Sequence, residues 1–226
     1  MYLMFAIVLR FARWFKRTGA QGSTRLPRPY NTRWVIDLTL TRGPNGRRYW
    51  LFGIIEYASR ALLVLIVLSR KSAAALAQAL VHVFHRFGAP RSLVTDNEGP
   101  FRSDLWKRLL ARHGVQHQRI EPYSPWQNGR IERFFGTLKP KLRRLLKRQR
   151  IRDRGGLQRA LNVFRHWYNH IRPHQALGIT VNGLAAYLYL TPAEAWWRGS
   201  GREFSDERGI WFEAWSGILR GYAWRR

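Results

Sequence analysis

The chain has 226 residues, of which 46% are hydrophobic, so it can bury the core of one substantial domain and is not a disordered tail. Forty Lys and Arg against thirteen Asp and Glu give a formal net charge of +27, which indicates a polyanionic partner, with nucleic acid as the leading candidate. The absence of cysteine excludes disulfide scaffolds, thiolate zinc sites and cysteine nucleophiles.

The first segment, Met1–Phe15, is apolar but is interrupted by Arg10 and Arg13, so it is too short to span a bilayer. It lacks the basic leading region and the small-residue cleavage site of a signal peptide. Arg10, Arg13 and Arg17 recur at helical spacing and predict a basic amphipathic helix. We favour an arm that packs on the protein or faces DNA over one that binds a membrane surface. Arg17–Asn31, rich in Gly, Ser, Pro and Arg, is predicted to be a basic linker.

A series of strands and helices follows the linker. Runs of β-favouring residues bounded by turn signals predict the strands, and the third strand is continuously apolar, which is typical of a strand covered on both faces. Ser72 is a suitable N-cap for the first helix, and Gly88 and Pro90 end it. The predicted strands are 33–40, 48–56, 61–68, 92–95 and 115–119, and the predicted helices are 72–87 and 103–113.

Three acidic residues stand out from this pattern. Asp37 lies in the middle of the first strand, and Asp96 directly follows the strand that ends at Thr95. Glu132, separated from Asp96 by thirty-five residues, lies near the start of a predicted helix. A carboxylate at the border of a packed helix is rigidly held, partly desolvated and open to a ligand.

The helix that bears Glu132 carries a continuous apolar stripe, formed by Ile131, Phe134, Phe135, Leu138, Leu142 and Leu145. Glu132, Lys139 and Arg143 lie together on one flank of the stripe. Pro140 is expected to kink or break this helix, because its ring clashes with the carbonyl group of Gly136.

Local sequence words around the three acids resemble those of the transposase and integrase core family (the DDE class, including retroviral-type integrases). The words are W-x-x-D-x-T at Trp34–Thr39, T-D-N at Thr95–Asn97 and N-G-x-x-E-R-x-x-x-x-L-K at Asn128–Lys139, together with the D,D(35)E spacing. The resemblance covers about residues 28–178. It implies an α/β, RNase H-like fold with a mixed five-stranded sheet flanked by helices.

The resemblance also implies a chemistry. Asp37, Asp96 and Glu132 would be both the catalytic residues and the metal ligands, holding two Mg²⁺ or Mn²⁺ ions. Asp37 would bridge both ions, Asp96 and Glu132 would each bind one, and Asn97 would shape the metal site. The implied reactions are cleavage of DNA at mobile-element ends and strand transfer into target DNA. The implied setting is a homo-oligomer on DNA in a bacterial-type cytoplasm, associated with the nucleoid and without stable membrane association.

Several basic and aromatic residues near Glu132 are candidate DNA contacts. The run from Lys139 to Arg154 holds nine basic residues and one Asp, which favours tracking of phosphates over a merely solvated face. Tyr123 and Trp126 are suited to stacking on splayed bases, although a packed loop explains them equally well. The full set of predicted DNA contacts is Lys139, Arg143, Arg144, Lys147, Arg148, Tyr123, Trp126, Asn128 and Arg133.

Beyond this region, Gly156–Ile171 is predicted to be a helix, and the phrase from Tyr168 to Gly178 again resembles these transposases. His166, His170 and His174 are spaced four apart, but Pro173 interrupts the helical spacing and no fourth ligand follows, so zinc is disfavoured. An insertion or an altered register is expected at 179–190. We therefore divide the chain into a basic arm and linker at 1–30, a catalytic core at 31–178 and a Trp-rich extension at 179–226, which either binds DNA or covers the core.

Two features depart from the family pattern. Relatives usually carry a helix-turn-helix region before the core, and thirty residues cannot hold one. Glu56 stands where relatives often have Asp, and we interpret this position as structural. Three alternatives stay open: a ribonuclease H or junction resolvase, against which the T-D-N and N-G-x-x-E-R words argue; a catalytically inactive, truncated transposase relic that only binds nucleic acid; and an electrostatic binding module with structural carboxylates.

Overall fold

The computed structural model describes most of the predicted core. Residues 1–29, which include the predicted basic arm, lie outside the described residues, and so do the predicted stacking residues Tyr123 and Trp126. The described ranges are 30–43, 46–121, 128–148, 151–181, 184–200, 211–214 and 219–222. Within them, no helix has the length and apolar character needed to cross a membrane.

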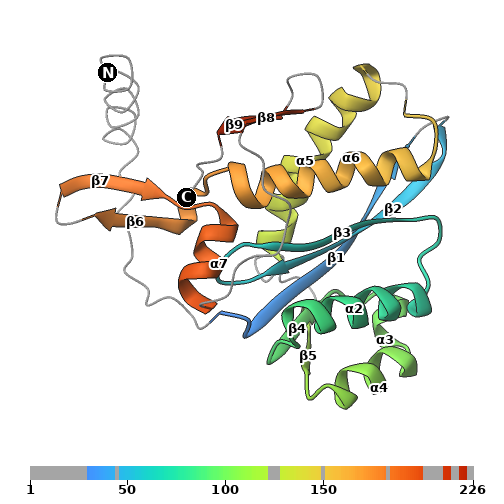
Figure 1. The fold of residues 1–226 in the computed structure, drawn as a ribbon. Coiled ribbons are helices and arrows are strands. Elements are labelled where there is room, and N and C mark those ends of the chain that lie inside the picture. Colours follow the sequence, from blue (N-terminus) through green and yellow to red (C-terminus); the bar gives the residue numbers. More distant parts are fainter. Residues whose placement is uncertain are drawn as a thin grey trace.

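One mixed sheet of five strands lies at the centre of the molecule, in the order β3-β2-β1-β4-β5 (Figure 1). β1, β2 and β3 are antiparallel neighbours, whereas β4 runs parallel to β1 and β5 parallel to β4. The prediction of a mixed five-stranded sheet is confirmed, and each strand is within two residues of its predicted bounds. The strands are β1 (Arg33–Arg42), β2 (Arg48–Glu56), β3 (Leu62–Leu68), β4 (Ser92–Thr95) and β5 (Gln116–Arg119).

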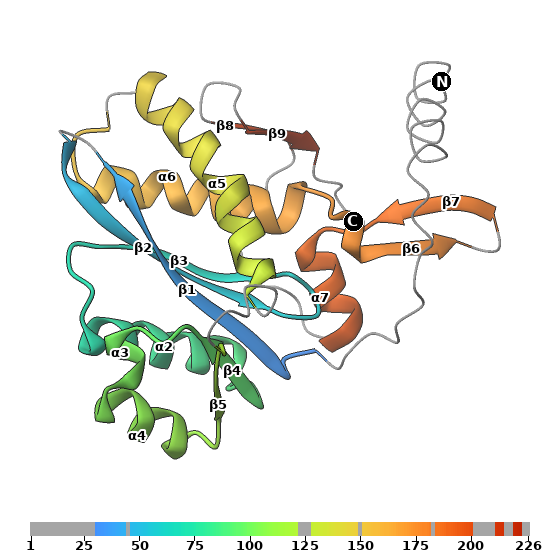
Figure 2. The same cartoon turned by 180° about the vertical axis from the view of Figure 1, so that it is seen from behind.

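Helices cover both faces of the sheet (Figures 1 and 2). α2 (Ala73–Phe87), α3 (Gly99–Arg102) and α4 (Asp104–Arg112) lie on one face, and α5 (Gly129–Arg148) and α6 (Arg154–His166) lie on the other. Side chains of β1 alternate between the two resulting cores, because successive residues of a strand point to opposite faces. Trp34 and Ile36 enter the core beneath α2, and Val35 enters the core beneath α5.

α5 supplies the predicted apolar stripe, and all six of its residues are buried. The Phe134 ring is central, with ring centroids 4.9 Å from Phe135, 5.2 Å from Tyr168 and 6.2 Å from Phe164. Pro140 does not break the helix, because α5 continues through it to Arg148. Buried residues on both sides of Pro140 pack into the same core, and this packing offsets one missing hydrogen bond.

Side-chain caps begin two helices where the sequence predicts. The hydroxyl of Ser72 accepts a hydrogen bond from the N–H of Ala75 at 3.3 Å, and the hydroxyl of Ser103 accepts one from the N–H of Trp106 at 3.3 Å. The short helix α3 was not predicted. Its Pro100 occupies one of the first two helical positions, where a missing N–H costs little.

The outer edge of β3 is hydrogen-bonded by side chains rather than by another strand. Gln158 of α6 accepts from the N–H of Val67 at 2.8 Å and donates to the carbonyl group of Leu65 at 3.0 Å. The buried amide of Asn169 does the same with both backbone groups of Leu62, at 2.9 and 3.0 Å. These bonds satisfy an edge that would otherwise be open to pairing with another chain.

The helix predicted for Gly156–Ile171 is divided in the structure. α6 ends at His166, and a π-helical turn, η3 (Trp167–Ile171), follows it. The predicted helix therefore extends to Ile171 as expected, and its last turn is π-helical. The wider turn buries Trp167, Tyr168 and Asn169 in succession, which places the amide of Asn169 against β3.

A hairpin occupies the segment where an insertion was expected. It leaves after η4 (Gln175–Leu177) and returns at Leu190, whose carbonyl group accepts from the N–H of His174 at 3.0 Å. α7 (Pro192–Ser200) follows, and its Trp196 ring lies 5.7 Å from Phe87 of α2, so this part of the extension covers the core. The remaining strands are β6 (Gly178–Val181), β7 (Leu184–Tyr189), β8 (Trp211–Ala214) and β9 (Leu219–Tyr222).

Candidate active site

Two of the predicted acidic residues lie side by side on the sheet. Asp37 is in the middle of β1, and Asp96 directly follows the last residue of β4. The two strands are parallel, with Val35 paired to Val94. The same register extended by two residues sets Asp37 beside Asp96. Both side chains are half-buried, so each remains partly open to solvent.

A glycine allows α5 to approach this point closely. The cross-strand partner of Asp37 is Gly53 of β2, so the two residues share the face of the sheet that α5 covers. A Cβ at Gly53 would lie 3.1 Å from the Phe135 ring, closer than van der Waals packing favours, and 3.6 Å from the Phe134 ring, an ordinary contact. The first turn of α5, which bears the exposed Glu132, is thereby held near Asp37.

The electrostatics of Asp37 reflect this crowding. Burial is the largest cause that raises its pKa, and the carboxylates of Asp96, Glu98 and Glu132 raise it further. The N–H of Leu38 donates to Asp37 Oδ1 at 2.8 Å and opposes the shift. Together these effects raise the pKa of Asp37 to about 7. Such a group favours its neutral form unless a cation is near.

Glu98 is a fourth acidic residue at this point and was not predicted from the sequence. Burial is the largest cause that raises the pKa of Asp96, and the Glu98 carboxylate raises this pKa further. The N–H of Glu98 donates to Asp96 Oδ1 at 3.0 Å and lowers the same pKa. Glu98 itself forms an ion pair with Lys71 at 2.8 Å, and Lys71 lies 4.4 Å from the centroid of the Trp50 ring. The sequence signal for Glu98 was its place two residues after Asp96, in the same turn.

The chemistry of these donors suits a hard divalent cation. Asp37, Asp96 and Glu132 offer only carboxylate oxygens, which are the ligands that Mg²⁺ and Mn²⁺ prefer. Their mutual repulsion, seen in the raised pKa of Asp37, is the kind that a bound cation relieves. Among the described residues, no group of three or more His, Asp or Glu side chains is already assembled at a metal-binding geometry.

Asn97 ties the turn that bears Asp96 to the neighbouring strand. Its amide donates to the carbonyl group of Ile120 at 2.7 Å, just beyond the end of β5. The hydroxyl of Thr95 lies 2.9 Å from Nε2 of His117 on the same strand. Burial, followed by the charge of Arg119, lowers the pKa of His117. These bonds fix the backbone on both sides of Asp96.

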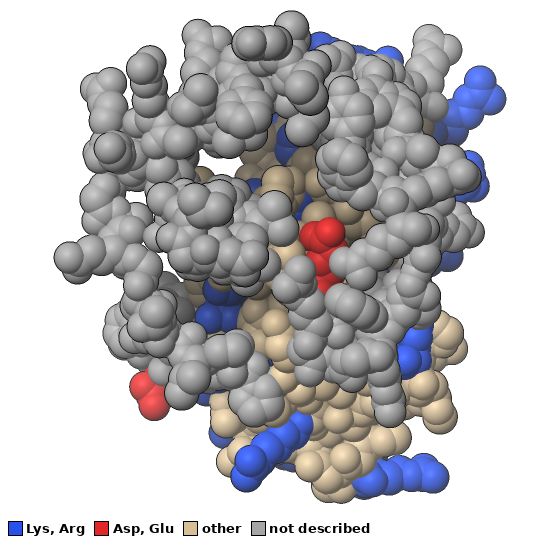
Figure 3. All heavy atoms as spheres, turned by 60° about the vertical axis from the view of Figure 1, so that its left-hand side comes forward, with Lys and Arg blue, Asp and Glu red and all other residues tan. Residues whose placement is uncertain are grey.

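The predicted DNA contacts on α5 differ in exposure. Arg133, Arg143, Arg144, Lys147 and Arg148 are exposed, and Lys139 is half-buried. Asn128 is buried, and its carbonyl group accepts from the N–H groups of Ile131 and Glu132, which begins the helix. Little of the Asn128 side chain is therefore available to DNA. Figure 3 shows Lys and Arg spread along the edges of the described surface, with acidic side chains visible at few places.

The three histidines considered as zinc ligands have separate surroundings. The rings of His166 and His170 stack, with centroids 4.7 Å apart. His174 instead meets the edge of the Tyr168 ring at 4.7 Å and lies 3.2 Å from the guanidinium of Arg172. Burial, followed by the charges of Arg172 and Arg60, lowers the pKa of His174 to about 3.

Glu56 is buried at the end of β2 and bonds within its own turn. Its Oε2 accepts from the N–H of Ser59 at 2.5 Å and from the hydroxyl of Ser59 at 2.6 Å. Burial is the main cause that raises the pKa of Glu56, and these bonds oppose the shift. This arrangement supports the interpretation of Glu56 as a structural residue.

We expect Gly53→Val to disturb both stability and activity. The added methyl groups would overlap the Phe134 and Phe135 rings and push α5 from β1, at a cost of about 1–3 kcal/mol. Thermal melting and DNA nicking should both decline. Gly136→Ala is the matched control, because a Cβ at Gly136 meets nothing within 4 Å and should stabilise α5 slightly. Parent-like melting and nicking in the Val variant would show that α5 does not depend on this approach.

The raised pKa of Asp37 predicts a pH dependence of stability in metal-free protein. The folded state keeps a proton that the unfolded chain, with a pKa of 3.8, has released. The free energy of unfolding should therefore fall as pH rises from about 4 to about 7, by an amount on the order of a few kcal/mol. Asp37→Asn should flatten this decline in urea titrations across that range. An equally steep decline in the variant would assign it to other groups.

Comparison with known proteins places the chain among integrase cores. Two family models, both described as Integrase core domain, match residues 27–125 and 113–180. The chain is 28% identical over 148 residues to an uncharacterized 39.2 kDa protein of insertion element IS476 from Xanthomonas euvesicatoria, covering 66% of this chain and 42% of that protein. It is 26% identical over 169 residues to an uncharacterized 31.7 kDa protein of insertion element IS407 from Burkholderia multivorans, covering 75% and 56%. The chain thus spans about half the length of these relatives.

Solved structures show the same fold. The HTLV-2 integrase catalytic core domain in complex with magnesium matches with a TM-score of 0.55 at 18% identity, covering 66% of this chain and 94% of that one. An integrase intasome of simian T-cell lymphotropic virus, in complex with a PP2A regulatory subunit, matches with a TM-score of 0.64 at 18% identity, covering 92% and 71%. These likenesses confirm the predicted RNase H-like fold.

Proposed function

Because the chain belongs to the integrase core domain family, we propose that it catalyses metal-dependent cleavage and strand transfer of DNA at the ends of a mobile element. Asp37, Asp96 and Glu132 are the proposed catalytic residues and metal ligands. The observation that carries the proposal is the placement of Asp37 and Asp96 on neighbouring parallel strands, near the first turn of α5, which bears Glu132. The insertion-element relatives support mobile-element DNA as the substrate.

The proposed cofactor is Mg²⁺ or Mn²⁺, with two ions per site. An HTLV-2 integrase core that shares this fold was solved in complex with magnesium. When bound, such ions supply charge neutralisation, activation of a water or 3′-hydroxyl and stabilisation of the leaving oxygen. With its pKa raised to about 7, Asp37 is only partly ionised at neutral pH, and a nearby cation would favour its ionised form.

The remaining residues position the site and hold the substrate. Asn97 fixes the turn that carries Asp96 through its bond to Ile120, and Gly53 lets α5 bring Glu132 close. The exposed basic side chains of α5 begin beside Glu132 and continue to Arg148. We assign them to the phosphate backbone of the bound DNA, which they would position without reading its sequence. A homo-oligomer on DNA is part of the same proposal.

A nicking and strand-transfer assay tests the proposed activity. The protein is incubated with supercoiled plasmid, or with labelled duplexes that carry element ends, with Mg²⁺, with Mn²⁺ or with EDTA. Cleavage and joined products that require the divalent ion would support the proposal. DNA binding without any product would instead favour the catalytically inactive relic. Cleavage of an RNA–DNA hybrid alone would favour a ribonuclease H.

The basic face of α5 predicts a steep salt dependence of DNA binding. Replacing Arg143, Arg144, Lys147 and Arg148 together with Gln should flatten the slope of log K against log salt by about 0.9 for each phosphate that these side chains no longer neutralise. Preference among DNA sequences should barely change, since binding to phosphates carries no sequence information. Fluorescence titrations from low to moderate salt measure the slope. If the quadruple variant keeps the parent slope, this face of α5 is only solvated.

A further inference from the structure

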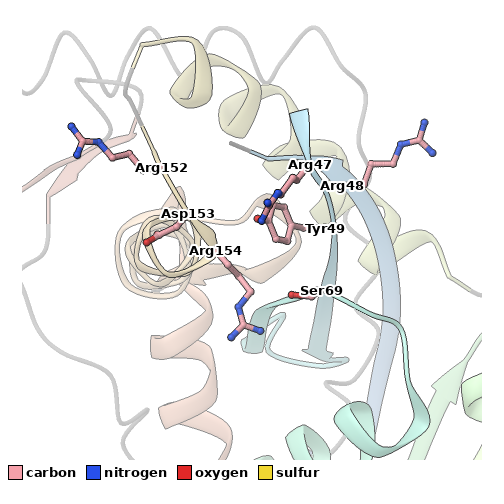
Figure 4. A pocket seen from close by; sticks show the side chains of 7 residues that line it. All are labelled: Arg47, Arg48, Tyr49, Ser69, Arg152, Asp153 and Arg154. Carbon is pink, nitrogen blue, oxygen red and sulfur yellow. The ribbon is translucent and has the colours of Figure 1, made fainter. Parts of the chain in front are cut away.

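An open hollow of about 520 Å³ lies at the end of the sheet remote from the chain's entry into β1. It forms where the hairpin between β1 and β2 meets the segment that leads into α6 (Figure 4). Arginines from both elements surround it, and two hydroxyl-bearing side chains lie among them. The lining residues are Arg47, Arg48, Tyr49, Ser69, Arg152, Asp153 and Arg154.

The base of the hollow is packed against the hydrophobic core. Tyr49 is buried in the core beneath α5 and α6, and its ring lies so close to Gly43 that any Cβ at this glycine would overlap it. The same Cβ would lie 3.5 Å from Leu157, in the first turns of α6. The N–H of Gly43 also donates to the carbonyl group of Arg47 at 2.7 Å, which closes the hairpin. The hairpin is therefore packed against α6, and this packing fixes the backbone that carries its arginines.

The charges around the hollow are unbalanced. Four arginines line it against one carboxylate, and that carboxylate is already engaged, since Asp153 Oδ1 caps α6 by accepting from the N–H of Gly156 at 2.6 Å. Within the described ranges, the ion pairs that form involve other residues and none of these four arginines. Like charges gathered around one concavity repel each other, and an anion among them removes that repulsion.

The side chains in Figure 4 show how such an anion would be held. Arg47 lies beside Tyr49 at the centre of the view, and Arg154 extends toward Ser69, whereas Arg48 and Arg152 point outward on opposite sides. Guanidinium groups form bidentate hydrogen bonds with phosphate oxygens. Arg48 and Arg152, which point outward, suit the neighbouring phosphates of an extended polyanion. The arrangement favours a phosphodiester chain over a single compact anion.

The hollow and the proposed active site share one face of the sheet. Asp37 pairs with Gly53, and Thr41 pairs with Tyr49, so all four lie on the face that α5 and α6 cover. Thr41 lies four positions beyond Asp37 on β1, which is roughly 13 Å along the strand at about 3.3 Å per residue.

We infer that this hollow binds a backbone phosphodiester of DNA away from the active site, at the β1–β2 end of the sheet. The inference rests on the proposed function for its substrate, and it adds a second phosphate site supplied by the β1–β2 hairpin and the start of α6. Because Arg47 and Arg154 come from two separate elements, a backbone bound between them also sets the direction in which DNA crosses the sheet.

The test compares Arg47→Gln/Arg154→Gln with a control of equal charge, Arg108→Gln/Arg112→Gln. The control residues are exposed on α4, which covers the other face. Binding of a labelled duplex is titrated against salt in the absence of divalent ions. Ethylation interference then identifies the phosphates that are needed for binding. The hollow variant should lose about 1.8 from the salt slope, at about 0.9 per neutralised phosphate. It should also lose interference at one or more phosphates away from the cleavage point, and the control should lose neither effect.

The possible outcomes separate the hollow from the proposed function. If the parent binds and nicks DNA but the two variants have equal salt slopes and equal interference patterns, the phosphate site in the hollow is overturned and the proposed function is not. A parent that binds no DNA would overturn both the hollow and the proposed function. Inorganic phosphate and pyrophosphate are titrated separately, and pyrophosphate binding that the hollow variant loses, while its DNA binding and interference stay as in the parent, would assign the site to a free anion instead. Matched melting curves confirm that all variants are folded.

Discussion

Glu132→Gln is expected to abolish divalent-dependent DNA cleavage while leaving the fold and the DNA affinity nearly unchanged. The side chain is exposed on the first turn of α5, so its replacement removes no packing. The amide keeps the shape of the carboxylate but not its charge, on which a hard cation depends. We expect at least a 100-fold loss, since loss of a metal ligand costs several kcal/mol and each 1.36 kcal/mol is tenfold in rate.

Plasmid nicking with Mg²⁺ measures this effect, and filter binding on the same preparation measures affinity. Asp104→Asn is the matched control, because Asp104 is an exposed carboxylate on α4, where its ion pair among the described residues is with Lys107 at 3.1 Å. The control should nick DNA as the parent does. Undiminished nicking by the Gln variant would remove Glu132 from the proposed site.

Phe134→Ala is expected to destabilise the fold strongly. Phe134 is 1% exposed and contacts three other rings, on α5, α6 and η3. Truncation of such a side chain leaves a cavity and costs about 3–5 kcal/mol. For a chain of this size the midpoint of thermal unfolding should fall by roughly 10 °C, at about 2–4 °C per kcal/mol.

Differential scanning calorimetry measures the midpoint for Phe134→Ala. Leu105→Ala is the control, because it also removes apolar atoms, yet Leu105 is 41% exposed on α4. Its midpoint should lie within about 2 °C of the parent value, since exposed substitutions change stability by about 0.5 kcal/mol or less. Equal midpoints for the two variants would mean that α5 and α6 do not share the core described here.

Local patterns were sufficient to predict most of the fold. Alternation and apolar runs located all five strands of the sheet, and Ser72 and Ser103 marked the starts of two helices through caps that depend only on adjacent residues. The apolar stripe of α5 was predicted residue by residue. Local preference did not determine that α5 continues through Pro140 or that the turn before Ile171 is π-helical, because distant packing outweighs it at both places.

Residues of the candidate site could be predicted where a local sequence pattern marks them, but not where only the fold brings them together. Asp37, Asp96 and Glu132 stood out by spacing and by the words around them. Glu98 lay just beyond one of those words, but its effect on Asp96 depends on the geometry of the turn. The arginine-lined hollow joins Arg47 and Arg154, which lie far apart in the sequence, so no linear pattern indicates it. The side chains that satisfy the edge of β3 were hidden for the same reason.

The most direct test of the proposed active site is anomalous diffraction from crystals soaked with Mn²⁺. We predict an anomalous peak between the carboxylates of Asp37 and Asp96, with Glu132 turned toward it, and we predict that this peak disappears in crystals of Asp96→Asn. A peak elsewhere on the chain, or unchanged density in the Asn variant, would contradict the assignment of these three carboxylates as the metal-binding catalytic site.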